Sequence, residues 1–469
     1  MPEAATLLEA LAAMVSEATP DRLPREVLDD ARAHLLDTLG ICLAATELDT
    51  SRAVTEYALG QGGRPEAHAI GGDSPIPAAL AALVNGTLAH SLDYDDTHLP
   101  SVVHPSATIV PACLAAAEQC GVGGRALLAA ITAGTEVCVR LGMAGYDREG
   151  RNSVYFDRGQ HATSMCGAIG AAGAAGALMG LDRAGIANAM AIAASMASGI
   201  IEANRSGGSV KRLHCGWAAH SAITAAALTG LGFTGPGTAL EGRFGFFEAY
   251  LSGRFDPEEI TGGLGERWAV SSVHFKPYPA NHFTHAGIDA ALAMRAGGVR
   301  LEEVASIRLG VAGPTVRTIG EPIVLKRNPE TGYQAQFSGP YTVVAALLGG
   351  GGLGLGLDDF TDELARSPER RRHMAKVEVF EDEDCNGIFP DAFPAVLEVE
   401  TAGGRLVTER VEVNRGGPER PLSSTDLELK FSDNARRVRS GDAVSRMLEA
   451  VGALGGQGTV AEVLASVRA

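Results

Sequence analysis

The sequence predicts a mainly α-helical fold, in which a large all-helical domain receives a smaller inserted α+β domain. The chain has 469 residues, enough for two or three domains. Hydrophobic residues make up 46% of it and aromatic residues only 5%, so the core must be built from small and aliphatic side chains. The residue pattern also changes from helical to alternating near residue 271, which marks the second domain.

Residues 1–270 are predicted to form the helical domain. Apolar residues recur at intervals of three and four, and Gly or Pro stands at the ends of the segments. Several segments are so apolar and small-sided that they should pack against one another with close axes. Helices are predicted over residues 24–45, 75–92, 104–119, 124–143 and 183–203.

An uncharged stretch at 162–180, ATSMCGAIGAAGAAGALMG, is long enough to raise the question of a membrane span. It consists mainly of Ala and Gly, whose transfer into lipid is weakly driven, so we expect a helix buried inside the protein. The acidic N-terminus has no basic region before a hydrophobic run, and no signal peptide is expected. Seven cysteines without a CxxC pair are typical of a cytoplasmic protein with reduced, mostly buried thiols.

Residues 271–420 are predicted to form the inserted α+β domain. Alternating, β-branched segments at 302–313, 373–382 and 394–414 predict strands around one or two helices. Residues 421–469 return to a helical pattern, so we expect them to rejoin the helical domain.

A formal net charge of −17 is spread along the chain, so we expect no nucleic-acid partner and no membrane surface. An anionic ligand would then need a local concentration of positive charge. Lys211, Arg212 and His214 follow a Gly-rich turn and precede an apolar helix, whose N-terminus would add to that attraction. The alternative is a surface turn with two solvated cations.

The most polar stretch of the chain, HSLDYDDTHLPSVVHPS at 90–106, admits three interpretations: a metal site, a proton-transfer site or a solvated loop. Its spacing matches neither HExxH nor an EF-hand loop, so we expect no metal. A solvated loop leading to a helix start accounts for Asp95, Asp96 and Ser106. It accounts less well for Asp93 and His104, because a helix cap does not need them to be titratable.

Histidines gather in a few places. Nine of the twelve fall in four short stretches, each beside a predicted helix end. In the last stretch, HFKPYPANHFTH, Lys276 lies in a Pro-stiffened segment before His282 and His285. This stretch begins the second domain, so we expect it to face the first across a cleft, a common place for a small-ligand site.

Five motifs in this order identify a resemblance over nearly the whole chain: SLDYDDTH...VHPS, RGQHATSMCGAIGAAGAAGALMGLD, GSVKRLHCGWAAHSAI, GFTGPGTALEGRFGFFEAY and KPYPANHFTHAGIDAAL. Together they resemble the MmgE/PrpD family, whose members include 2-methylcitrate dehydratase, cis-aconitate decarboxylase and iminodisuccinate epimerase. The resemblance implies a homodimer with a helical domain, a smaller α+β lid and a cofactor-free site between them. It also implies a small anionic di- or tricarboxylate as substrate.

The matching positions of these motifs supply the expected site. We assign His104 and His161 as an acid/base pair, because imidazole titrates near neutrality. Lys211 is expected to stabilise negative charge that develops on the substrate. Asp93 would orient a histidine, and Tyr341, in the QFSGPY segment, would donate a hydrogen bond. The expected substrate-binding residues are Lys276, Thr97, His282, Asn281, Arg212 and His214.

The sequence departs from the patterns of individual family members. Relative to the decarboxylases, one more residue separates Thr97 from His104, and Asn281 stands where a catalytic histidine is placed. The dehydratases usually have Asn-Asp-Thr and an aromatic residue, whereas this chain has Asp-Asp-Thr-His at 95–98. Dehydration, epimerisation and decarboxylation therefore stay open, as do the substrate and the pathway.

We expect a cofactor-independent lyase or isomerase that works by His acid/base catalysis with Lys charge stabilisation. The alternatives are a 2-methylcitrate-type dehydratase and a non-catalytic member that serves as a binding or assembly scaffold.

Overall fold

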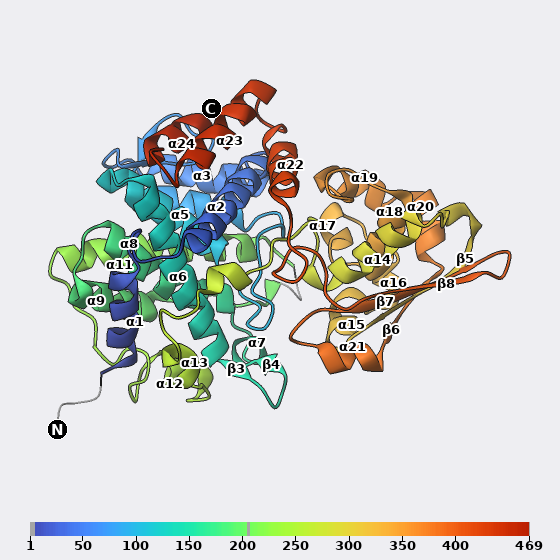
Figure 1. Cartoon of the computed structure of the whole chain (residues 1–469), viewed down its shortest axis with the longest axis horizontal. Helices are drawn as coiled ribbons and strands as arrows, with labels where there is room; N and C mark the ends of the chain where they lie inside the picture. Colours follow the sequence, from blue (N-terminus) through green and yellow to red (C-terminus); the bar gives the residue numbers. More distant parts are fainter. Residues whose placement is uncertain (1–4, 204–206, 469) are drawn as a thin grey trace. The chain divides into compact units, whose positions relative to one another are not determined.

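The computed structural model describes residues 5–203 and 207–468, and it is mainly helical (Figure 1). The chain divides into two compact units: the first combines Met1–Val273 with Asn434–Ala469, and the second is His274–Asp433. The sequence analysis places these boundaries at 270 and 420. That the second unit acts as a lid remains a prediction.

The first unit is a stack of helices in which α8 is central. It packs against α5, α6, α9 and α11, and nearly all of it is buried because its side chains are small. The unit departs from an all-helical domain in two short antiparallel strand pairs, β1 (Ala67–His68) with β2 (Pro75–Ile76) and β3 (Tyr146–Asp147) with β4 (Asn152–Ser153). Its helices are α1 (Leu7–Glu17), α2 (Arg25–Ala45), α3 (Asp49–Gly60), α4 (Ala78–Ala89), α5 (Ser106–Cys120), α6 (Gly124–Ala144), α7 (Val154–Asp157), α8 (Ala162–Leu178), α9 (Arg183–Met196), α11 (Val210–Gly230), α12 (Phe246–Leu251), α13 (Glu258–Thr261), η1 (Ala269–Ser272), α23 (Gly441–Ala453) and α24 (Val460–Val467).

Helices α4 and α11 pack closely because two glycines meet where they cross. A Cβ atom on Gly216 would lie 2.2 Å from the Leu83 carbonyl oxygen, and one on Gly86 would lie 2.8 Å from the Cys215 carbonyl oxygen. Only glycine allows the two backbones to approach so closely. The crossing brings the end of α4, which leads into His90, close to the beginning of α11.

The apolar helices of the first unit lie in its core. Within the described part of the chain, one helix, α6, is long and apolar enough to cross a membrane by length and composition, and 83% of that window is buried. Helix α8, which contains the uncharged stretch noted in the sequence, is a shorter apolar helix and is also buried. All seven cysteines are free thiols, and six of them are buried, as the sequence predicts.

The second unit contains a four-stranded mixed sheet with the order β6-β5-β7-β8 (Figure 1). Strand β5 is parallel to β6 and antiparallel to β7, and β7 forms an antiparallel pair with β8. Ile307 and Leu309 in β5 are buried, and the intervening Arg308 pairs with Glu398 on the exposed face. This alternation is the one that the sequence predicts. The strands are β5 (Val304–Val311), β6 (Val377–Glu381), β7 (Ala395–Thr401) and β8 (Leu406–Val411).

Helices complete the second unit. Helix α14 packs against β7, β8 and α18, and these elements enclose the unit's hydrophobic core. Helix α22 (Ser424–Ala435) extends across the boundary, so the return to the first unit comes later than residue 421. The other helical segments are η2 (His282–Thr284), α14 (His285–Ala296), η3 (Leu301–Glu303), α15 (Gly313–Ile319), α16 (Ile323–Lys326), α17 (Gly332–Ala335), α18 (Gly339–Leu348), η4 (Leu357–Phe360), α19 (Asp362–Ala365), α20 (Pro368–Met374) and α21 (Glu383–Ile388).

Candidate active site

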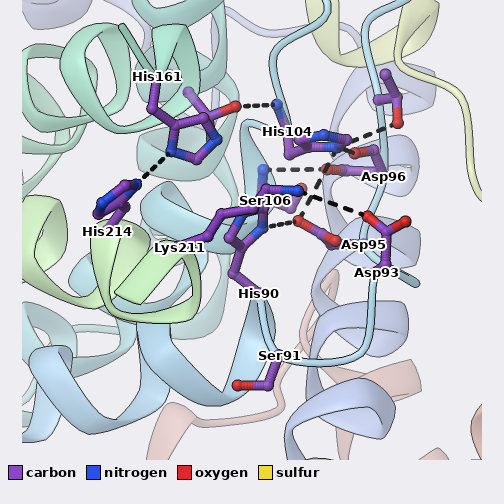
Figure 2. A network of polar contacts seen from close by, with 12 residues as sticks. His90, Ser91, Asp93, Asp95, Asp96, His104, Ser106, His161, Lys211 and His214 are labelled. Carbon is purple, nitrogen blue, oxygen red and sulfur yellow. Dashed lines mark hydrogen bonds and ion pairs between the residues drawn. The ribbon is translucent and has the colours of Figure 1, made fainter. Parts of the chain in front are cut away.

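Four buried histidines of the first unit form a continuous chain of rings, which we call the imidazole cluster: His104, His90, His161 and His214 (Figure 2). The ring centroids are separated by 5.5 Å, 5.2 Å and 5.1 Å in that order. His90 follows α4, His104 precedes α5, His161 is the N-cap of α8 and His214 lies near the start of α11. Four helix ends therefore converge on one place.

A tight loop brings Thr97 and His104 together. The backbone N–H of His98 donates to the Val103 carbonyl oxygen at 2.9 Å, which folds the loop back on itself. Thr97 Oγ1 consequently lies 3.1 Å from His104 Nδ1. Within the same segment Asp93 has a φ of 52° and Val102 a φ of 53°, conformations that are costly for side-chain-bearing residues. Surrounding contacts must therefore hold this loop in shape.

The structure corrects the solvated-loop interpretation for Asp95 and Asp96, which are only 3% and 2% exposed. Asp95 Oδ2 lies 2.6 Å from His90 Nδ1. Asp96 Oδ2 lies 2.7 Å from Nδ1 of His34, a buried residue of α2. The interpretation failed because each carboxylate pairs with a nearby histidine, and this pairing offsets the free-energy cost of removing the carboxylate from water.

Asp96 also fixes the start of α5 and the orientation of His104. Its carboxylate accepts the backbone N–H of Ser106 at 3.2 Å, so a loop carboxylate satisfies the helix start that the sequence assigns to Ser106 itself. Its backbone carbonyl lies 2.6 Å from His104 Nδ1. Because a carbonyl oxygen only accepts, His104 Nδ1 carries a proton. In the neutral ring Nε2 then holds the lone pair, as a base requires.

Lys211 reaches the same place from the start of α11. Its Nζ lies 4.0 Å from Asp93 Oδ1, and its side chain is 15% exposed. The structure thus joins two predicted site residues that are far apart in the sequence (Figure 2). The neighbouring Arg212 donates to Thr50 Oγ1 in α3 at 3.1 Å.

Burial and neighbouring charges lower the pKa of two histidines of the cluster and raise the pKa of a third. Burial lowers the pKa of His161 well below 6.5, and the charges of His90 and Lys211 add to the effect. The pKa of His214 is lowered to about 4 by burial and by the same two neighbours. For His90 burial also lowers the pKa, but Cys215 and Asp95 outweigh it and raise the pKa to about 10. His161 and His214 are thus neutral at pH 7, whereas His90 is protonated.

The remaining predicted site residues belong to the second unit, where Lys276 is 1% exposed. Asn281 accepts the backbone N–H of Phe283 at 3.1 Å and begins η2. His282 stacks on His285 with ring centroids 4.5 Å apart, and its Nε2 lies 3.1 Å from the side-chain nitrogen of Asn414. Their roles toward a substrate remain predictions.

Tyr341 is fully buried in the core of the second unit. Its hydroxyl donates to the carbonyl oxygen of Asp359 and accepts a hydrogen bond of 2.8 Å from Arg370. Both groups belong to the same unit. The predicted hydrogen bond from Tyr341 to substrate stays a prediction that the resemblance alone supports.

No group of three or more His, Cys, Asp or Glu side chains in the described ranges is arranged to hold a metal ion.

The sequence analysis missed two contributions to this arrangement. His90 opens the polar stretch, but its central place between His104 and His161 depends on where α4 ends. His34 lies in α2, more than fifty positions earlier, and has no local feature that connects it with Asp96. The position of His90 in the cluster and the pairing of His34 with Asp96 both depend on tertiary packing.

Comparison with known proteins shows matches along most of the chain. Residues 9–258 match the MmgE/PrpD N-terminal domain, and residues 278–454 match the MmgE/PrpD C-terminal domain. A cis-aconitate decarboxylase from Mus musculus is 28% identical over 458 residues, which are 95% of this chain and 90% of that protein. The cis-aconitate decarboxylase from Homo sapiens is 29% identical over 463 residues, 95% of this chain and 91% of that protein. A cis-aconitate decarboxylase-like protein from Aspergillus oryzae is 28% identical over 295 residues, 59% of each chain.

Proposed function

The chain belongs to the MmgE/PrpD family of enzymes, and from that premise we propose that it is a cofactor-independent lyase or isomerase acting next to a carboxylate of a small di- or tricarboxylic acid. The observation that carries this proposal is the convergence of four buried imidazoles and the Lys211 ammonium at one place. The relatives named as decarboxylases support a lyase in particular.

Bond breaking beside a carboxylate leaves negative charge on carbon that spreads onto the carboxylate oxygens. Fixed positive groups must balance that charge, and a preorganised donor is worth about 3 kcal/mol in a water-poor site. Lys211 is suited to this role because its pairing with Asp93 fixes the ammonium within reach of the cluster. His90, whose charge is offset by the Asp95 carboxylate, lies between His104 and His161.

Proton transfer falls to His104 and His161. His161 is neutral at pH 7 because burial and nearby charges lower its pKa, so it is available as a base. His104 presents Nε2 because its Nδ1 donates to the Asp96 carbonyl. One group accepts a proton and the other returns one. The substrate decides whether the outcome is inversion at carbon, loss of hydroxide or loss of carbon dioxide.

The second-unit residues Lys276, Asn281, His282 and Tyr341 stay in the proposal on the family resemblance. Asn281 stands where the decarboxylase pattern has a catalytic histidine, and its amide caps η2. An amide does not transfer protons, which keeps a dehydratase or an epimerase beside a decarboxylase as the finer reaction. The same observation motivates the alternative of a non-catalytic scaffold.

We also propose a homodimer in the cytoplasm, without nucleic-acid or membrane partners. Val210, Leu213 and Trp217 expose apolar side chains along α11, a surface that a second copy of the chain would cover. Sedimentation at several protein concentrations tests this. A monomer at every concentration would contradict the dimer.

Incubation with a panel of di- and tricarboxylic acids in D₂O, followed by NMR with and without EDTA, tests the proposed function. Exchange without net conversion would identify an epimerase, and loss of water or carbon dioxide a lyase. Conversion that EDTA abolishes would contradict cofactor independence. If no acid is converted and the variants His104→Ala and Lys211→Ala bind the same ligands as the wild type, the scaffold alternative holds.

A further inference from the structure

We infer that His214 is a positioning residue that exchanges a proton with His161, rather than a residue that only binds substrate. The inference rests on the proposed function. Its basis is one contact: Nδ1 of His214 lies 3.1 Å from Nδ1 of His161 (Figure 2). Both side chains are buried, at 2% exposure for His161 and 8% for His214.

Two imidazole nitrogens at this distance share a single proton. One Nδ1 must donate and the other must accept, so the protonation of one ring determines that of the other. If His161 donates through Nδ1, its Nε2 holds the lone pair of a base. If His214 donates, His161 Nε2 carries a proton and can act as an acid. His214 therefore sets the state in which His161 meets its substrate.

The backbone at Gly199 keeps the two rings in place. Its carbonyl accepts the backbone N–H of His161 at 3.0 Å. A Cβ atom at this position would lie 3.3 Å from the His161 Cβ and 3.4 Å from the His214 Cγ. Gly199 also has a φ of 134°, which side-chain-bearing residues rarely adopt. The rings are thus packed against a backbone segment that other residues would disturb.

The charges around His161 explain why a second imidazole is useful. After burial, the charges of His90, Lys211, His214 and His104 each oppose a positive charge on the His161 ring, so His161 and His214 do not both stay protonated. A proton taken up at His161 Nε2 would create an imidazolium beside these groups. Transfer of the other proton, from His161 Nδ1 to His214 Nδ1, restores a neutral His161.

The transfer balances when solvent water is the final proton acceptor. The substrate proton adds to His161 Nε2, and the Nδ1 proton passes to His214 Nδ1. His214, which is 8% exposed, then releases its Nε2 proton to a solvent water. After one passage each ring is again neutral with its proton on the opposite nitrogen. The reverse passage returns a proton to substrate, so one dyad serves both directions.

The first test needs no substrate. In protein labelled with ¹⁵N-histidine, we expect a scalar coupling across the hydrogen bond between the Nδ1 atoms of His161 and His214 at pH 7. The coupling should vanish in His214→Phe and persist in His220→Gln. His220 is a matched control because it lies on the same helix and stacks on Trp217. Absence of the coupling, together with an unchanged His161 tautomer in His214→Phe, would overturn the inference.

The second test uses the acid that the panel identifies. We expect His214→Phe to lower kcat by about 10- to 100-fold, within the range for a positioned proton-transfer group, and added imidazole to restore part of it. His220→Gln should keep the wild-type kcat. A loss that imidazole does not restore in a folded variant would indicate a purely structural role and contradict the relay. If the coupling is present but the wild type converts no acid, the proposed function fails while the proton-sharing pair stands.

Discussion

The two units of this protein use histidine in different ways. In the first unit His90 pairs with the Asp95 carboxylate, and His161 contacts His214 within a chain of four rings. In the second unit His285 Nε2 contacts the backbone carbonyl of Ala280, and His282 contacts the Asn414 amide. For these four contacts the hydrogen-bond partners are thus ionisable side chains in the first unit and neutral groups in the second. We infer that the first unit tunes its imidazoles electrostatically.

As a consequence, His90 and His161 differ in protonation state although they lie in one cluster. Within one cluster the pKa of His90 is raised to about 10, whereas the pKa of His161 is lowered well below 6.5. Neighbouring titratable groups whose pKa values move apart are typical of acid/base sites. Substitutions in the two units should therefore have unequal effects.

The largest expected effect is on turnover. His161→Gln should reduce kcat/KM by about 10² to 10⁴ because it removes a positioned base. His285→Gln in the second unit should reduce it much less, since the described contact of His285 is with a backbone carbonyl. Kinetics with the acid identified in the panel compare the two. Equal losses in two folded variants would remove the distinction between the units.

The next effect concerns the charge of Lys211. Lys211→Met should lower kcat by about 10² to 10³, the cost of removing one preorganised donor. Because the charge it balances develops only in the transition state, we expect a smaller change in KM. Circular dichroism would establish that the variant is folded. A rise in KM with unchanged kcat would show that Lys211 only binds the substrate.

The crossing of α4 and α11 gives a prediction about stability. Gly216→Ala should destabilise the fold by about 1–3 kcal/mol, because a Cβ there would overlap the backbone of α4. Gly230→Ala, at the end of the same helix, is the control, since no atom outside the local backbone lies within 4 Å of its added Cβ. Thermal unfolding measures both. Equal unfolding midpoints would mean that the close approach is unimportant.

The last expected effect is on the pH dependence of stability. The pKa of His214 is lowered to about 4, so between pH 6.5 and 4 the unfolded chain binds a proton that the folded chain does not, and stability falls as the pH decreases. The pKa of His90 is raised to about 10. Its contribution to the free energy of unfolding is therefore complete below pH 6.5 and is lost as the pH rises through 10.

Two variants separate these contributions. His214→Phe should weaken the decrease of the unfolding midpoint between about pH 6.5 and 5, and His90→Gln should weaken the decrease on the alkaline side. The comparison requires thermal unfolding midpoints of both variants and the wild type on the acidic and the alkaline side. Parallel curves for all three proteins would contradict the opposite shifts of the two histidines.

Much of the fold could be predicted from the sequence because its signals are local. The helices α2, α5 and α6 and the strands β5 and β7 lie where apolar spacing places them. Lys211 and Asp93 both lie in recognisable motifs, but their pairing was not predicted, since Asp93 was expected to orient a histidine. The burial of Asp95 and Asp96 was not predicted. Asp96 pairs with His34 from a distant helix, and the pairing of Asp95 with His90 depends on where α4 ends. The contact between His161 and His214 likewise depends on how α8 and α11 pack.

We propose that the imidazole cluster of the first unit transfers a proton at the carbon beside a carboxylate. The most direct test is the rate of deuterium incorporation at that carbon in D₂O, measured by NMR for the wild type, His161→Gln and His285→Gln. We expect rapid incorporation in the wild type, nearly the same rate in His285→Gln, and almost none in His161→Gln. Incorporation by His161→Gln at the wild-type rate would contradict this proposal.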